Sequence, residues 1–180
     1  MGARKVLFVD DEPQKMADHI AALTEAGYLV TSRKSTDEAL HEFLEENPGV
    51  FQLVILDMML PPPDGKDIVP SRYFGEVVKI ETWEGLHSGG NLLGILRRRC
   101  PGPTPPVLIL SNVSESEVLI EAWDQFVNWC DFRKQTVPSA AGEGAIRDVL
   151  RGSFGAWVQS KKRTPPWELP RLAESIIGTA

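Results

Sequence analysis

The chain has 180 residues, and its 19 Lys and Arg against 25 Asp and Glu give a formal net charge of −6 at pH 7. Hydrophobic residues make up 42% and charged residues 24%, so the chain can bury a core and is not disordered throughout. The length fits one domain with an appendage rather than two full domains, and the acidic balance excludes a nucleic-acid binder that works by bulk positive charge.

Cysteine content and hydropathy indicate the compartment. The two cysteines, Cys100 and Cys130, are too few for a disulfide framework and form no C-x-x-C pair, so reduced thiols are expected. Charged residues occur too early at the N-terminus for a signal peptide, and no apolar run approaches the about 20 residues of a membrane span. We therefore predict a soluble, cytoplasmic protein with no membrane partner and no nucleic-acid partner.

The first part of the chain alternates short apolar runs with amphipathic stretches. Strands are predicted at residues 6–9, 28–32 and 51–56. Pro13 suits the first turn of a helix that ends at Gly27. The capping box of Ser35 and Glu38 predicts a second helix, which ends at residues 47–49.

The second part repeats this alternation. Two further strands are predicted at residues 107–110 and 130–133, and the capping box of Ser114 and Glu117 predicts a helix between them. Another helix is expected to begin near Ser139. Its apolar residues are Ile146, Val149, Leu150, Trp157 and Val158.

Strands that alternate with helices predict an α/β fold with a parallel sheet covered on both faces. In such open sheets, ligands bind outside the carboxyl ends of the strands. The residues predicted at those ends are Asp10, Asp11, Asp57, Ser111 and Lys134. Each of them alone has a structural explanation as a cap, a turn or a solvated strand end, so only their joint placement predicts a site.

The chemistry of these residues is coherent. Three carboxylates close together repel one another unless a cation lies among them, and oxygen ligands suit Mg²⁺. A carboxylate beside such a cation can attack a phosphoryl group and form an acyl phosphate. The Ser111 hydroxyl and the Lys134 ammonium group can each contact a phosphoryl oxygen.

Four motifs, VLFVDDEP, LVILDMMLPPPDG, PVLILS and FRK, together resemble the receiver domain of two-component response regulators over about residues 5–158. The resemblance implies a flavodoxin-like (βα)5 fold, a doubly wound parallel five-stranded sheet with strand order 2-1-3-4-5. It implies that Asp57 is the phosphoacceptor for a sensor histidine kinase or phosphotransfer protein, with Ser111 as the switch hydroxyl and Lys134 as the phosphoryl contact. It also implies Mg²⁺ binding by Asp10, Asp11, Asp57 and the backbone carbonyl of Met59.

The stretch between Asp57 and Ser111 is much longer than this family usually has, which predicts an insertion at about residues 66–88, between the third strand and the third helix. Two interpretations of this insertion stay open. It is either a decorative segment folded against the domain, or a flap or docking surface that limits which kinase reaches Asp57.

The fifth predicted strand also departs from the family pattern. The family usually has an aromatic switch residue three positions before the lysine and a proline after it, whereas Asp131 and Gln135 occupy these positions. Phe132, one residue later, is the candidate aromatic switch. This departure puts the coupling between phosphorylation and output in doubt.

The predicted receiver domain covers residues 1–160, and residues 161–180 form a C-terminal tail that is too short for a helix-turn-helix output domain. The tail is expected to contain a short amphipathic helix. Its apolar residues are Trp167, Leu169, Leu172, Ile176 and Ile177. A homodimer through the face of the fourth helix, fifth strand and fifth helix is one arrangement that the resemblance implies.

Three functions compete at this point. The leading one is a stand-alone phosphorylation switch that signals through altered protein–protein contacts with an unknown output protein and catalyses only its own phosphorylation and dephosphorylation. The second is a pseudo-receiver or scaffold that binds partners without such switching. The third, a Mg²⁺-dependent phosphatase, is disfavoured because that class usually has D-x-D after the first strand, whereas Glu12 stands at its second position here.

Overall fold

The computed structural model describes residues 2–45, 50–60, 68–70, 77–79, 89, 92, 105–112 and 143–179. Five strands form one sheet in the order β2-β1-β3-β6-β7, and every neighbouring pair is parallel. In chain order, these strands are β1 (Arg4–Val9), β2 (Tyr28–Arg33), β3 (Phe51–Leu56), β6 (Val107–Ser111) and β7 (Ala156–Ser160). The predicted order 2-1-3-4-5 is therefore confirmed.

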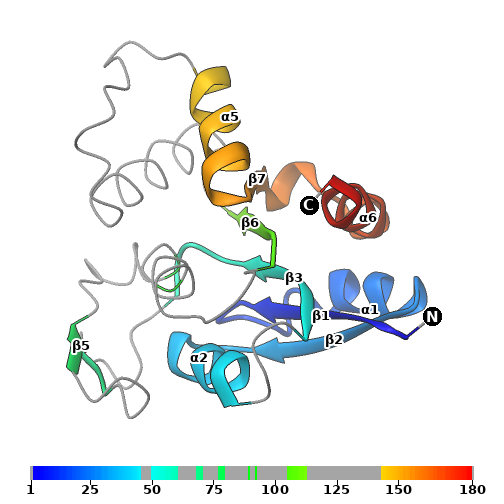
Figure 1. Ribbon diagram of the computed structural model, residues 1–180. Coiled ribbons are helices and arrows are strands. Elements are labelled where there is room, and N and C mark those ends of the chain that lie inside the picture. The colour runs from blue at the N-terminus through cyan, green and yellow to red at the C-terminus, as the bar shows by residue number, and fades with distance from the viewer. Residues whose placement is uncertain are drawn as a thin grey trace.

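Helices cover both faces of this sheet (Figure 1). On one face lie α1 (Ala17–Glu25) and α6 (Leu169–Thr179); on the other lie α2 (Thr36–Glu45) and α5 (Glu143–Phe154). Successive residues of β1 point to opposite faces, so Leu7 and Val9 join the core beneath α2 and α5 while Val6 and Phe8 join the core beneath α1 and α6. Strands buried on both faces read as continuous apolar runs, which is why β1, β3 and β6 could be located from the sequence.

The fifth strand predicted at residues 130–133 is a wrong assignment, because the strand that pairs with β6 is β7. Residues 130–133 themselves lie outside the described residues. The helix expected to continue through Val158 ends at Phe154, and Trp157 and Val158 belong to β7. The cause is Gly155, whose φ of 55° is a left-handed conformation that ends α5 and turns the chain into the sheet.

The segment after residue 160 contains the expected helix, α6, but this helix is a layer of the fold. Leu169, Ala173 and Ile176 are fully or almost fully buried against the sheet and α1. At the amino edge of the sheet, Glu174 accepts hydrogen bonds from Arg4 and from the Tyr28 hydroxyl, which ties α6 to β1 and β2. Two short 3-10 helices, η4 (Lys161–Arg163) and η5 (Pro166–Glu168), connect β7 to α6.

An insertion follows β3, as predicted. Its described residues include a separate two-stranded antiparallel sheet of β4 (Ile68–Pro70) and β5 (Val77–Lys79). The backbone N–H of Gly89 donates to the carbonyl of Met58 at 3.1 Å. Met58 and Gly89, which lie before and after the insertion, are therefore neighbours. Among the described residues, no helix is long and apolar enough to span a membrane.

The role of Gly155 can be tested by substitution. Gly155→Ala should lower the free energy of unfolding by about 1–2 kcal/mol, because an L-residue with a side chain is strained at this φ. Gly152→Ala is the matched control, because Gly152 lies inside α5 and an added methyl group there would meet nothing within 4 Å. This control change should stabilise the protein by about 0.5–1 kcal/mol. Denaturant unfolding measures both, and equal effects of the two substitutions would contradict this account of the α5–β7 junction.

Candidate functional site

Two carboxylates project from the carboxyl ends of neighbouring central strands. Asp10 follows β1 and is 2% exposed, and Asp57 follows β3 and is 5% exposed. The backbone N–H of Asp57 donates to the backbone carbonyl of Val9 at 2.9 Å, and the backbone N–H of Asp10 donates to the backbone carbonyl of Arg33 at 3.0 Å. The hydrogen bonds between the strands therefore continue to the site and fix both backbones. Asp11 adds a third carboxylate, and carboxylate oxygens of the three residues lie within 4.8 Å of one another.

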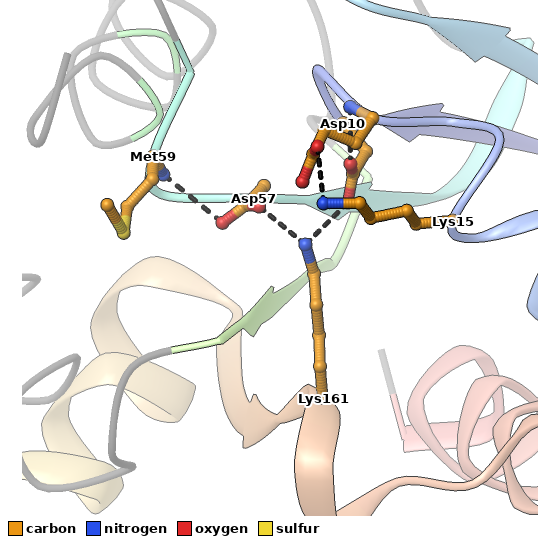
Figure 2. A network of polar contacts seen from close by, with 6 residues as sticks. Asp10, Lys15, Asp57, Met59 and Lys161 are labelled. Atoms are coloured by element: carbon orange, nitrogen blue, oxygen red, sulfur yellow. Dashed lines mark hydrogen bonds and ion pairs between the residues drawn. The ribbon is translucent and has the colours of Figure 1, made fainter.

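Lys161 lies among these carboxylates, directly after β7 (Figure 2). Its Nζ donates to Asp10 Oδ2 at 2.6 Å and to Asp57 Oδ2 at 2.5 Å, and its side chain is only 8% exposed. Burial alone would lower the pKa of Lys161, but the charge of Asp57 and hydrogen bonds to both carboxylates raise this pKa above its ordinary value. The lysine is therefore a fixed, buried cation.

The remaining carboxylate oxygens are held by backbone groups. Asp57 Oδ1 accepts the N–H of Met59 at 3.1 Å (Figure 2). Asp10 Oδ1 accepts the N–H of Glu12 at 2.9 Å, which closes the turn after β1. Each of the two carboxylates is thus oriented by a backbone donor of its own, and the two share the ammonium group of Lys161.

Asp11 has a different environment. Burial, followed by the charges of Asp10 and Asp57, raises the pKa of Asp11 above its ordinary value of 3.8. The ionised form of Asp11 is therefore disfavoured, because the ammonium group of Lys161 is already shared by Asp10 and Asp57.

Ser111 ends β6 and is fully buried. It stands in register with Ser160 of β7, the residue before Lys161. Its Oγ has no hydrogen-bond partner among the described residues. A buried hydroxyl in this state has the capacity to bind a group that enters from the strand ends.

Gly89 packs directly on the backbone that presents Asp57. A Cβ at this position would lie 2.1 Å from the carbonyl oxygen of Asp57 and 2.7 Å from the Cα of Met58. Only glycine allows this approach. The residue that resumes the domain after the insertion therefore contacts the end of β3.

No family model matches the sequence, and no curated protein matches it significantly. Solved structures do match. A CheY-like receiver domain protein from Methanospirillum hungatei has a TM-score of 0.58 and 15% identity, with 99% of this chain and 96% of that chain covered. A receiver domain protein from Clostridium thermocellum has a TM-score of 0.57 and 19% identity, with 98% and 95% covered. The chemotaxis response regulator CheY4 of Vibrio cholerae has a TM-score of 0.55 and 18% identity, with 97% and 99% covered.

The chain has the receiver-domain fold. The predicted residues Asp10, Asp11 and Asp57 are brought together by this fold, and Ser111 ends the strand next to β3. Lys134 and Phe132 lie outside the described residues.

Lys161 is the site residue that sequence reasoning misses. Helical periodicity extends the preceding helix through the β7 residues, so Lys161–Arg163 resembles a solvated helix end. A usable signal is present in Gly155 followed by an alternating five-residue run that ends in Ser160 and Lys161. Counted from Lys161, the position three residues earlier is the buried Val158, and Lys162 follows. The aromatic residue and the proline that the receiver resemblance implies are therefore absent from these two positions as well.

The charge excess of the site predicts a stability effect. Because the pKa of Asp11 is raised, ionised Asp11 destabilises the fold at neutral pH, and stability should increase as the pH falls through the raised pKa towards 3.8. Asp11→Asn should raise the Tm without added metal at pH 7 by about 2–4 °C, or about 1 kcal/mol, since Asp11 is partly exposed and screened by solvent.

Thermal unfolding with and without Mg²⁺ completes this test. Mg²⁺ should raise the Tm of the wild type and have little effect on Asp11→Asn. Asp148→Asn, at an exposed position of α5, is the matched control and should leave the Mg²⁺ response intact. A lower Tm for metal-free Asp11→Asn than for the wild type would contradict the assigned repulsion.

Proposed function

We propose that this chain is a phosphorylation-dependent signalling switch of a two-component system. Asp57 accepts a phosphoryl group from the phosphohistidine of a sensor histidine kinase or phosphotransfer protein, and the output is a change in protein–protein contacts. The observation that carries this proposal is the contact of buried Lys161 with Asp57 and Asp10 at the carboxyl edge of a receiver-fold sheet. We further propose that the domain extends through α6.

The donor set fits Mg²⁺. Three carboxylates have oxygens within 4.8 Å of one another, and among the described residues Lys161 is the ammonium group bound to two of them; the resulting negative excess suits a hard divalent cation with oxygen ligands. Asp10, Asp11, Asp57 and the backbone carbonyl of Met59 would hold the ion. When bound, Mg²⁺ supplies positive charge that neutralises the phosphoryl oxygens during transfer.

The chain's own residues account for the transfer chemistry. An oxygen of Asp57 attacks the phosphorus atom, a P–O bond forms as the P–N bond breaks, and the electron pair returns to the imidazole, which takes a proton from solvent. Lys161, already within hydrogen-bond distance of Asp57, neutralises a phosphoryl oxygen as charge moves onto the new acyl phosphate. The Ser111 hydroxyl, which lacks a partner among the described residues, donates a hydrogen bond to another phosphoryl oxygen.

The same contacts provide a route to output. In the unphosphorylated state, Lys161 bridges two carboxylates, and the phosphoryl group would compete for this ammonium group while engaging Ser111. The ends of β6 and β7, paired at Ser111 and Ser160, would then move together. A homodimer through the face of the fourth helix, fifth strand and fifth helix, an unknown output protein and a cytoplasmic location remain predictions.

One observation favours the second candidate, a pseudo-receiver or scaffold. The buried residue three positions before Lys161 is Val158, which cannot act as an aromatic switch. If output in this chain depended on such an aromatic residue, phosphorylation would be uncoupled from partner binding. The two candidates differ in whether Asp57 is phosphorylated and whether its phosphorylation changes partner contacts.

Incubation with phosphoramidate and Mg²⁺, followed by intact-mass measurement, tests the proposed chemistry. The wild type should gain one phosphoryl group, and Asp57→Ala should gain none. Lys161→Ala should slow the gain by at least about tenfold, as expected for the loss of a charged group that stabilises transferred charge. Lys162→Ala is the matched control, since Lys162 is the adjacent, exposed lysine, and its rate should stay close to that of the wild type.

The outcomes separate the candidates. No mass gain in the wild type would support the scaffold, and rapid multiple turnover of phosphoramidate would support a phosphatase. A strong loss in Lys134→Ala with none in Lys161→Ala would overturn the assignment of the phosphoryl contact to Lys161.

We also propose that the insertion at about residues 66–88 controls access of protein phosphodonors to Asp57. The segment that contains it is bounded by Met58 and Gly89, and the N–H of Gly89 donates to the carbonyl of Met58, next to Asp57. An insertion beside the phosphoacceptor would obstruct the approach of a bulky donor protein more than that of a small phosphodonor.

Because Met58 and Gly89 adjoin, replacement of residues 66–86 by a short Gly-Ser linker should retain the fold. Phosphorylation by phosphoramidate should change by less than about twofold, whereas transfer from phosphorylated sensor kinases should change by about tenfold or more for at least one kinase in a panel. Far-UV circular dichroism checks the fold. Equal transfer from every kinase before and after the replacement would show that the insertion is decorative.

A further inference from the structure

The position of Lys161 depends on a short turn between β7 and α6. Lys161 begins η4, a three-residue 3-10 helix, and so receives little support from regular secondary structure. Yet its Nζ is held at 2.5 and 2.6 Å from two carboxylates on other strands. Other contacts must fix this turn.

Thr164 closes the turn on one side. Its Oγ1 donates to the carbonyl of Ser160 at 3.0 Å, and its backbone N–H donates to the carbonyl of Lys161 at 3.3 Å. Thr164 is 2% exposed, so these bonds are shielded from water. The two bonds bracket Lys161 between the end of β7 and Thr164.

His19 of α1 holds the turn from the outside. Its Nε2 lies 2.9 Å from the backbone carbonyl of Thr164. A carbonyl only accepts hydrogen bonds, so Nε2 carries the proton and donates. The other ring nitrogen, Nδ1, is buried and has no hydrogen-bond partner among the described residues. A buried polar atom without a partner costs free energy, which a purely apolar side chain at this place would avoid.

We propose that His19 is a positioning residue for Lys161. By anchoring Thr164 to α1, it fixes the turn so that Nζ reaches Asp57 and Asp10. This inference rests on the proposed function for its consequence in phosphoryl transfer, but the anchoring itself is a property of the unphosphorylated protein. The carboxylates follow β1 and β3, so His19 acts on the position of Lys161 and not on the backbones that present the carboxylates.

The test compares His19→Gln with His19→Asn in the full chain. The glutamine amide can place an N–H donor where Nε2 lies, whereas the shorter asparagine amide reaches only the Nδ1 position. Phosphorylation by phosphoramidate should be about tenfold slower in His19→Asn, because small misplacement of a catalytic group is costly. It should be largely restored in His19→Gln. Equal rates for the two variants would overturn the proposal.

Two further measurements separate this inference from the proposed function. In a Lys161→Met background, His19→Asn should cause no additional loss of rate, because its effect passes through Lys161; a full additional loss would overturn the proposal. The Lys161 ammonium group is 8% exposed and hydrogen-bonded, so its protons should exchange slowly enough to give an NMR signal without any phosphodonor. This signal should be broadened or lost in His19→Asn and kept in His19→Gln. If the wild type is never phosphorylated, the proposed function fails, while this ammonium signal still decides whether His19 positions Lys161.

Discussion

The structure is organised around one electrostatic constraint, the placement of a buried ammonium group among three carboxylates. Asp10 and Asp57 are almost fully buried, and two like charges at this distance repel unless a cation lies between them. Lys161 supplies one positive charge, so with all three carboxylates ionised the cluster retains two negative charges. The raised pKa of Asp11 reflects this excess. A divalent cation balances the cluster, whereas a second lysine would leave it negative.

This constraint explains the topology better than any local feature does. The carboxylates come from two adjacent central strands, and the compensating lysine must arrive at the same edge from a parallel strand. β7 is the outer neighbour of β6, so its carboxyl end is close enough for a long side chain to reach Asp57. The segments that join the strands are not subject to this electrostatic constraint. An insertion after β3 is tolerated because Met58 and Gly89, which lie before and after it, are hydrogen-bonded neighbours.

The central strands, which carry the carboxylates, could be predicted from the sequence more readily than the edge strand that precedes the lysine. β1, β3 and β6 are apolar runs with charged or polar ends, so they and the site residues Asp10, Asp11, Asp57 and Ser111 could be located. β7 is an edge strand whose residues alternate, and Trp157 and Val158 also continue the helical spacing of Val149 and Leu150. Periodicity alone could not separate these interpretations, whereas the left-handed φ of Gly155 does. Because of this error, the prediction did not include Lys161, whose Nζ contacts Asp10 and Asp57.

The corrected strand changes how a signal can leave the site. With Val158 three positions before Lys161, that position of β7 has no aromatic side chain whose rotation could report on Ser111. The turn after β7 offers another route. Thr164 links this turn to Ser160, and His19 links it to α1, while η5 packs on both α1 and α6. Any displacement of Lys161 therefore acts on α1 and α6, so the surface that responds to Asp57 is expected on the α1–α6 face of the sheet.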